Sequence, residues 1–185
     1  MEKRTDFTTS RLRLRPFRPD DFQCLQEYAL KEYFWRFLPL ERQTPDSVRL
    51  FLDKRLEEEW GIDGYHCAVE LIDEQRLIGT VRIAVKDAKN CSGDVGYALN
   101  EVFSGKGYMT EAVQKILQVG FNELCLHRIW ATADVANTAS WRLMERVGMQ
   151  REGRLRQHKK IGSKWHDSYL YSILRSDAEA RLPKI

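Results

Sequence analysis

Two glycines flank a lysine immediately before a long amphipathic segment, in the stretch VFSGKGYMTEAVQKILQVGF. At such a junction the backbone N–H groups around Gly105 and Gly107 can converge on one point, where the positive end of a helix dipole also acts. The pattern predicts either a simple turn or a site for an anion such as a phosphate. Two nucleotide-binding motifs are excluded, because Lys106 is not followed by Ser or Thr and because Thr110 stands where G-x-G-x-x-G needs its third glycine.

A serine and an asparagine in the segment NTASWRLMERVGM are the second feature that could do chemistry. Ser140 lies three and seven positions before Leu143 and Val147, so helical spacing puts it on an apolar face. A hydroxyl there either bonds back to a local carbonyl or faces a ligand with which it exchanges a proton. Asn137 precedes the helix and is a candidate N-cap.

The elements that must position these residues follow a mixed α/β pattern. Alternation of apolar and polar residues predicts strands at 11–15, 65–71, 76–86, 93–99, 127–135 and 164–174, the second to fourth forming an antiparallel meander. Helical periodicity and end signals predict helices at 19–30, 44–61, 108–120 and 137–148, with Pro19 and Pro45 at first-turn positions, Thr44 as an N-cap and Gly61 and Gly148 as stops. Strands first and strand–helix alternation later predict one α+β, or mixed α/β, domain over residues 1–185.

Composition narrows the class of partner. The chain has 185 residues, 30 Lys and Arg against 27 Asp and Glu, and a formal net charge of +3. This charge is too small to indicate a nucleic-acid binder, whereas a phosphorylated small ligand fits it. The cysteines are scattered and the histidines lack ligand spacing, so neither a disulfide framework nor a metal site is predicted. The N-terminus is charged and no segment approaches a membrane span, so a cytoplasmic protein is predicted.

The glycine loop and the serine segment together, in this order, resemble the GCN5-related N-acetyltransferase (GNAT) superfamily. VGYALNEVFSGKGYMTEA resembles its fourth strand and acetyl-CoA loop, and ANTASWRLMERVGMQREG resembles its N-x-x-S-x-x-L-x-x-x-G-F segment. The resemblance runs from TSRLRLRPFRPDDF to DSYLYSILRSD and is greatest to the RimJ/RimL type of ribosomal-protein N-terminal acetyltransferases. It implies a mostly antiparallel twisted sheet of about six or seven strands flanked by helices.

The resemblance also implies which residues hold acetyl-CoA. The backbone of the glycine loop would hold the pyrophosphate, and the strand from Tyr97 to Leu99 would pair with the pantetheine arm and stabilise the oxyanion. Asn137 would bond the pantetheine, and Ser140 would reprotonate the leaving thiolate. The implied coenzyme-binding residues are Tyr97, Ala98, Leu99, Ser104, Gly105, Lys106, Gly107, Tyr108, Met109, Thr110, Asn137 and Ser140. Ser104 and Met109 depart from the family's pattern Q/R-x-x-G-x-G/A, and Arg146 is either a ligand of the adenosine phosphates or a surface residue.

The implied reaction is direct transfer of the acetyl group of acetyl-CoA to a primary amine, with no metal. An amine is protonated near neutral pH, so a base or a water chain must remove its proton. Glu70 and Asp94 are the candidate carboxylates, with Glu70 the first choice. Either residue is also explained as a solvated charge at a strand edge.

No motif constrains the acceptor amine, whose site is expected to be built from the first two helices and the segment YFWRF. The resemblance favours a protein N-terminal α-amine. The alternative acceptor is a small amine: a polyamine, an amino acid or an antibiotic amine. The alternative from another functional class is a binding module. Such a module would sense acyl-CoA without catalysis, or would dock on RNA through the basic run 151–160. Homodimers are common in the family, so a second copy is a candidate partner, and nucleic acid is expected only indirectly, through a ribosomal protein.

Overall fold

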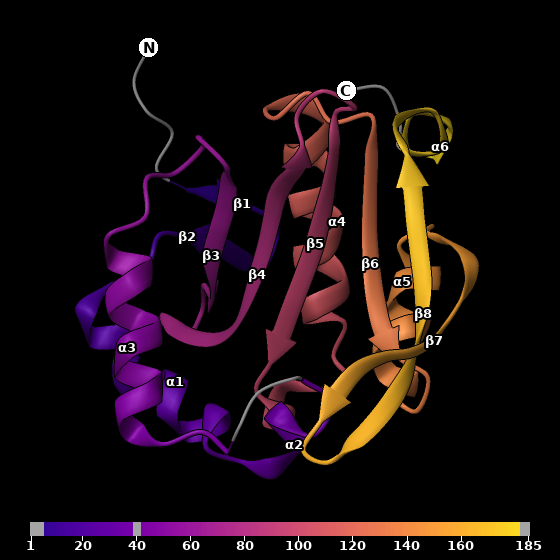
Figure 1. Cartoon of the computed structure of the whole chain (residues 1–185). Helices are drawn as coiled ribbons and strands as arrows, with labels where there is room; N and C mark the ends of the chain where they lie inside the picture. Colours follow the sequence, from indigo (N-terminus) through magenta and orange to yellow (C-terminus); the bar gives the residue numbers. More distant parts are fainter. Residues whose placement is uncertain (1–5, 39–41, 182–185) are drawn as a thin grey trace.

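The structure, a computed structural model, describes residues 6–38 and 42–181 and in them shows one eight-stranded sheet with helices on both faces (Figure 1). The strands are β1 (Phe7–Thr8), β2 (Leu12–Arg15), β3 (Gly64–Leu71), β4 (Arg76–Asp87), β5 (Ser92–Leu99), β6 (Arg128–Asp134), β7 (Gln150–Ile161) and β8 (Lys164–Leu174). The helices are η1 (Pro19–Asp21, 3-10), α1 (Phe22–Ala29), α2 (Glu32–Trp35), α3 (Pro45–Leu56), η2 (Glu101–Phe103, 3-10), α4 (Tyr108–Asn122), α5 (Thr138–Arg146) and α6 (Arg175–Arg181). The predicted mixed α/β class is confirmed.

The strand order is β1-β2-β3-β4-β5-β6-β8-β7, and every neighbouring pair is antiparallel except β5 and β6. The strand count exceeds the predicted six or seven. The six predicted ranges lack β1, which has only two residues, and β7, whose mostly exposed, polar residues show no alternation of apolar and polar side chains. β5 and β6 pair only over residues 92–94 and 128–130. Beyond them the two strands diverge (Figure 1), so in the described part of the chain their facing edges have no strand partner.

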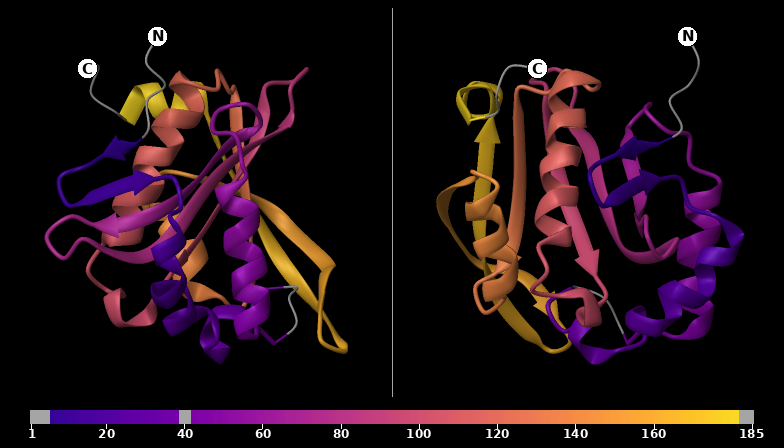
Figure 2. Two further views of the ribbon diagram at one scale, coloured as in Figure 1. Left: turned by 90° about the vertical axis from the view of Figure 1, so that its left-hand side faces the viewer. Right: turned by 180° about the vertical axis from the view of Figure 1, so that it is seen from behind.

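Helices α4 and α5 cover one face of the sheet, and α1 and α3 lie on the other (Figure 2). The apolar stripe of α4, including Ile116 and Leu117, is buried in the larger core cluster. Leu25 of α1 and Leu52 of α3 belong to a second cluster. Gly120 lets α4 lie close to the sheet, because a Cβ there would overlap the side chains of Ile83 and Ile129.

Helix starts follow the sequence signals more closely than helix ends. Thr44 caps α3 by accepting a hydrogen bond from the Ser47 N–H at 3.2 Å, as predicted. The predicted stop at Gly61 is wrong, because α3 ends at Leu56 and three glutamates follow, where the negative end of the helix dipole disfavours their charge. Pro19 begins a 3-10 turn, and the α-helix itself begins at Phe22.

Candidate active site

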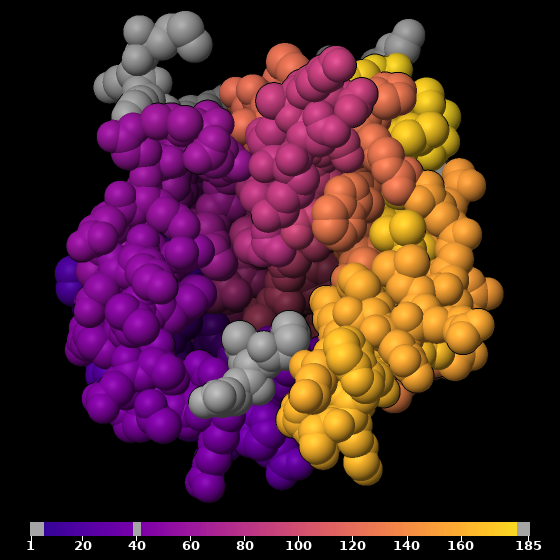
Figure 3. All heavy atoms as spheres, in the orientation of Figure 1, coloured from indigo at the N-terminus to yellow at the C-terminus, as the bar shows by residue number. Residues whose placement is uncertain are grey.

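A cavity of about 520 Å³ opens where β5 and β6 diverge. In the space-filling view the molecule is hollowed there, between α3 and the hairpin formed by β7 and β8 (Figure 3). Side chains of α1, of α3 and of the segment YFWRF line it, among them Tyr28, Phe34, Phe37 and Phe51.

The structure brings only some of the predicted coenzyme-binding residues to this cavity. Tyr97, Ala98, Asn137 and Ser140 line it. Leu99 and the loop residues 104–110 are not among its described lining residues, and lie instead at the end of β5 and the beginning of α4. The site therefore has two parts, an apolar-walled cavity and a separate glycine loop that is connected to it along β5.

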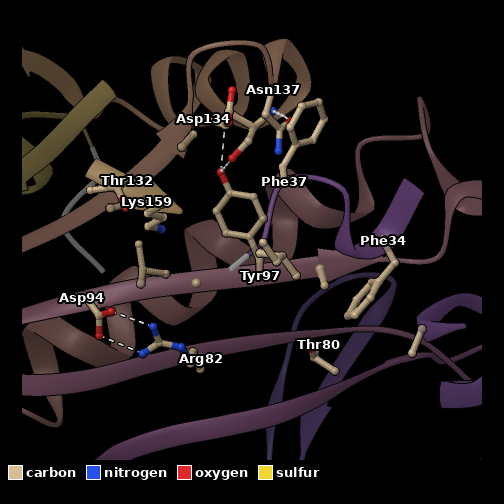
Figure 4. Close-up of a pocket in the computed structure, with 18 of the residues that line it drawn as sticks. Phe34, Phe37, Thr80, Arg82, Asp94, Tyr97, Thr132, Asp134, Asn137 and Lys159 are labelled. Atoms are coloured by element: carbon tan, nitrogen blue, oxygen red, sulfur yellow. Dashed lines mark hydrogen bonds and ion pairs between the residues drawn. The ribbon is translucent and has the colours of Figure 1, made fainter. Parts of the chain in front are cut away.

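The hydroxyl of Tyr97 crosses the gap between β5 and α5 and contacts Ser140 (Figure 4). It lies 3.0 Å from Ser140 Oγ and donates to the Ser140 carbonyl at 3.0 Å. Asn137 is the N-cap of α5, since its side-chain oxygen accepts from the Ser140 N–H at 3.2 Å. The Ser140 hydroxyl is thus held at the cavity by a tyrosine and not by a carbonyl of its own helical turn.

Burial raises the pKa of Tyr97 to about 12, although the hydrogen bond to Ser140 acts in the opposite direction. The phenol is therefore protonated at neutral pH. Because its one proton is directed at the Ser140 carbonyl, the Ser140 hydroxyl is the donor in the contact with the Tyr97 oxygen, and it has to rotate away from Tyr97 to give its proton to a ligand in the cavity. Sequence reasoning assigned Tyr97 only a backbone role, since no sequence signal shows that a strand side chain reaches a helix 43 residues later.

The glycine loop has the backbone conformation that an anion site requires. Gly105 and Gly107 have left-handed φ angles of 78° and 80°. Gly107 is the N-cap of α4, and no side chain in the described part of the chain caps this 15-residue helix. Left-handed residues at alternate positions before an uncapped helix end direct N–H groups outward, which is an arrangement that binds phosphate.

Arg11 holds this loop from the side. Its guanidinium donates to the Lys106 carbonyl at 3.1 Å, lies 4.6 Å from the ring centroid of Tyr108 and forms an ion pair with Glu111 at 2.6 Å. The Glu111 carboxylate also accepts from Thr9 at 2.5 Å. These bonds join the turn between β1 and β2 to the start of α4, which fixes the loop without occupying its N–H groups.

Several other predicted site residues lie outside the cavity, each in a different environment. The side chain of Met109 is 5% exposed and packs in the core, so only its backbone can reach a ligand. The Lys106 ammonium lies 5.7 Å from the ring centroid of Phe103. Ser104 is exposed and Thr110 is half-buried. Arg146 lines a different cavity of about 120 Å³ against α4 and α6.

The structure does not bring Glu70, the first-choice base, to the cavity. Glu70 is 2% exposed and its carboxylate accepts from Arg15 Nε at 2.6 Å and from Arg13 Nη1 at 3.1 Å. Arg15 in turn donates to both oxygens of Asp21, at 2.9 and 2.7 Å. Glu70 is therefore not placed to act as the base, because its carboxylate is buried away from the cavity and its oxygens are occupied by two arginines, so it has no access to a substrate proton.

Asp94, the second candidate base, does line the cavity. Its two oxygens accept from Arg82 at 2.8 and 2.6 Å, in a bidentate pair (Figure 4). The Lys86 ammonium lies 3.6 Å from the same carboxylate. His66 also lines the cavity, and burial, assisted by the neighbouring Arg55, lowers its pKa to about 3. His66 is therefore neutral at physiological pH, and its Nδ1, 2.6 Å from Arg55 Nη1, is occupied.

Comparison with known proteins identifies the family. A sequence model described as an acetyltransferase (GNAT) domain matches residues 11–150. The chain is 34% identical over 170 residues to the uncharacterized N-acetyltransferase YnaD of Bacillus subtilis, covering 92% of this chain and 97% of YnaD. It is 32% identical to the putative ribosomal N-acetyltransferase YdaF of the same organism, covering 90% and 92% of the two chains. A crystal structure of a GNAT-family acetyltransferase from Bacillus anthracis superposes with a TM-score of 0.85 at 31% identity, covering 93% of this chain and 99% of that one.

The chain belongs to the GNAT acetyltransferases. It is an acyltransferase that takes its acetyl group from acetyl-CoA and acts on an amine. The residues present fit this cosubstrate, since the loop offers uncapped N–H groups to a pyrophosphate and the diverging strands leave room for an extended arm. Within residues 6–38 and 42–181 no helix is long and apolar enough to cross a membrane.

Proposed function

We propose that this protein acetylates the N-terminal α-amine of a protein acceptor, in the manner of the ribosomal-protein N-acetyltransferases. The observation that carries the catalytic part is the Ser140 hydroxyl, fixed 3.0 Å from the Tyr97 hydroxyl in the opening between β5 and β6. The similarity to YdaF, whose name includes a ribosomal substrate, supports the choice of acceptor. An open cavity walled by α1 and α3 on one side and by β7 on the other also suits a chain terminus better than a fully enclosed small molecule.

In the proposed reaction the neutral amine attacks the thioester carbonyl, a C–N bond forms and the C–S bond breaks. Backbone N–H groups of β5 near Tyr97 and Ala98 stabilise the oxyanion. The Ser140 hydroxyl gives a proton to the leaving thiolate and regains one from water in the open cavity, and Tyr97 positions that hydroxyl. Of the two carboxylates predicted as bases, Asp94 is the one that lines the cavity, but both of its oxygens accept from Arg82, so the amine proton passes to a water chain in the open cavity.

The coenzyme phosphates bind the loop from Ser104 to Thr110 through its backbone. Left-handed Gly105 and Gly107 direct the N–H groups, and Arg11 positions the loop by its bond to the Lys106 carbonyl. Asn137 keeps its N-cap role and presents the rest of its amide to the pantetheine arm. The proposal also includes a single catalytic domain that acts in the cytoplasm, and a homodimer as its assembly.

A small-molecule amine is the second candidate acceptor. It is supported by the aromatic wall of the cavity, where Phe34, Phe37 and Phe51 could enclose a compact ligand. A non-catalytic sensor of acyl-CoA is the alternative from another class, and it would bind acetyl-CoA without transferring the acetyl group to an amine.

An acceptor screen separates these candidates. Peptides with free N-termini, amino acids, polyamines and aminoglycosides are incubated with acetyl-CoA, and free thiol is measured together with the mass of the acetylated product. We expect turnover on N-terminal peptides, which is lost when the peptide is N-acetylated beforehand. Turnover confined to small amines would contradict the choice of acceptor, and binding of acetyl-CoA with no turnover on any amine would favour the sensor.

A further inference from the structure

One ammonium group in the cavity has no hydrogen-bond or ion-pair partner among the residues that the structure describes. Lys159 of β7 lines the cavity, and in the part of the chain that the structure describes it forms neither a hydrogen bond nor an ion pair. Figure 4 shows it beside Thr132 of β6, near the Asp94–Arg82 pair. Burial and the nearby charge of Arg82 lower the pKa of Lys159, while Asp94 and Asp134 partly oppose this effect. The ammonium is thus partly desolvated and only incompletely compensated.

The backbone of β7 is shaped so that Lys159 turns to the cavity. The pairing of β7 with β8 shifts its register between Leu155 and Lys159. Gln157 within this bulge has a left-handed φ of 47°, and its N–H donates to the Asp167 carboxylate at 2.7 Å. A bulge re-aims the side chains that follow it, and a non-glycine residue adopts such a φ only when its surroundings hold it there.

Among the described residues that line the cavity, the two carboxylates, Asp94 and Asp134, are already engaged. Both oxygens of Asp94 accept from Arg82. Asp134 accepts from the Ala136 N–H at 2.8 Å and contacts His166 Nδ1 at 2.6 Å. A second ammonium on the acceptor, as in a polyamine, would therefore find no free carboxylate here, whereas an anionic group would find the three donors of Lys159.

We infer that Lys159 is a specificity residue which binds a carboxylate on the acceptor, so that the preferred substrate is a primary amine with a carboxylate close to it. This inference rests on the proposed acetyltransferase function of the same cavity. Two sources carry this chemistry: an acidic side chain near a protein N-terminus and the α-carboxylate of a free amino acid. Polyamines are disfavoured as acceptors, because they carry a second ammonium and no carboxylate.

The test compares matched acceptors in steady-state acetylation. One pair is a peptide with Glu as its second residue and the same peptide with Gln there, whose terminal amines have nearly the same basicity. The other pair is alanine and alaninamide, and spermidine is added as a dication without a carboxylate. Each acceptor is measured with the wild type, with Lys159→Gln, with the charge-conserving Lys159→Arg, and with Lys160→Gln. Lys160 is the next residue of the same strand, is exposed and does not line the cavity.

We expect the wild type to prefer the carboxylate member of at least one pair by about tenfold in kcat/KM, the size expected for one charge-assisted hydrogen bond. The pair in which the preference occurs identifies the source. Lys159→Gln should reduce it to within about twofold, while Lys159→Arg and Lys160→Gln retain it. Because each variant is judged by a ratio of two acceptors, a general loss of activity does not mimic the result.

Equal kcat/KM for both members of both pairs, with turnover intact, would overturn the inference and leave the proposed function standing. The inference would also be overturned if Lys160→Gln reduced the preference for the carboxylate acceptor as much as Lys159→Gln does. That result would mean that the positive charge of the strand acts at a distance, without a contact between Lys159 and the acceptor. No turnover on any amine, although acetyl-CoA binds, would overturn the proposed function and this inference with it.

Discussion

Removing the Glu70 carboxylate should destabilise the protein without removing its chemistry. Glu70 is 2% exposed and accepts from Arg15 at 2.6 Å and Arg13 at 3.1 Å, while Arg15 is itself only 4% exposed. Glu70→Ala leaves the buried Arg15 with Asp21 as its remaining carboxylate. Breaking a buried ion pair from one side costs about 3–5 kcal/mol. For a chain of this length that corresponds to a fall in Tm of about 6–20 °C.

Thermal unfolding followed by circular dichroism measures the loss of stability. The retained chemistry is measured as kcat/KM at a temperature well below the unfolding transitions of the wild type and of the variant. Glu70→Gln keeps one acceptor oxygen and should lose about half as much stability. Asp20→Ala, an exposed carboxylate of η1, is the matched control and should change the free energy of unfolding by about 0.5 kcal/mol or less. The reasoning is refuted if Glu70→Ala keeps its Tm within about 2 °C while kcat falls by about 100-fold, because that pattern identifies a catalytic base.

Ser140→Ala should lower kcat by about 100-fold while the KM for acetyl-CoA changes by less than about threefold, because the hydroxyl acts on the leaving thiolate; an unchanged kcat would make Ser140 a structural residue. Gly107→Ala should raise the KM for acetyl-CoA by about tenfold, since a left-handed φ costs Ala roughly 1–2 kcal/mol and the loop would relax, whereas Gly153→Ala, where a Cβ would meet nothing within 4 Å, should have no effect. Burial lowers the pKa of His66 to about 3, so below pH 6.5 this imidazole binds a proton in the unfolded chain but not in the folded chain. The free energy of unfolding is therefore unaffected by His66 above pH 6.5 and falls as the pH drops from 6.5 toward 3. The loss is about 2 kcal/mol at pH 5. Denaturant unfolding at pH 7 and pH 5 should therefore show a smaller loss for His66→Gln than for the wild type, and equal losses would contradict the assignment.

Local signals in the sequence predict most of the fold. The alternation over residues 65–99 corresponds to the antiparallel meander β3–β4–β5, and the caps at Thr44 and Asn137 lie where α3 and α5 begin. These features depend on neighbours within a few residues, which a sequence displays directly. The two-residue β1 and the early end of α3 depend on tertiary packing and on flanking charge, which periodicity does not show.

The candidate site also has a part that local sequence signals predict and a part that depends on tertiary contacts. The glycine loop and the Asn137–Ser140 segment are contiguous, so their residue types and spacing are visible in the sequence. The partner of Glu70 is not visible, because Arg15 lies 55 residues away in the chain. The contact between Tyr97 and Ser140 and the turn of Lys159 into the cavity likewise need the sheet, its divergence at β6 and the bulge in β7 before they exist.

The central claim is that the opening between β5 and β6, with its glycine loop, holds acetyl-CoA. Thermal unfolding of the purified chain in a titration of acetyl-CoA tests it most directly, because a ligand that binds only the folded state stabilises that state. At about 100 times the dissociation constant the account predicts about 2.7 kcal/mol of added stability, or a rise in Tm of about 5–11 °C, with a smaller rise for Gly107→Ala at the same concentration. An unchanged Tm through millimolar acetyl-CoA, or an equal rise in both proteins, would contradict it.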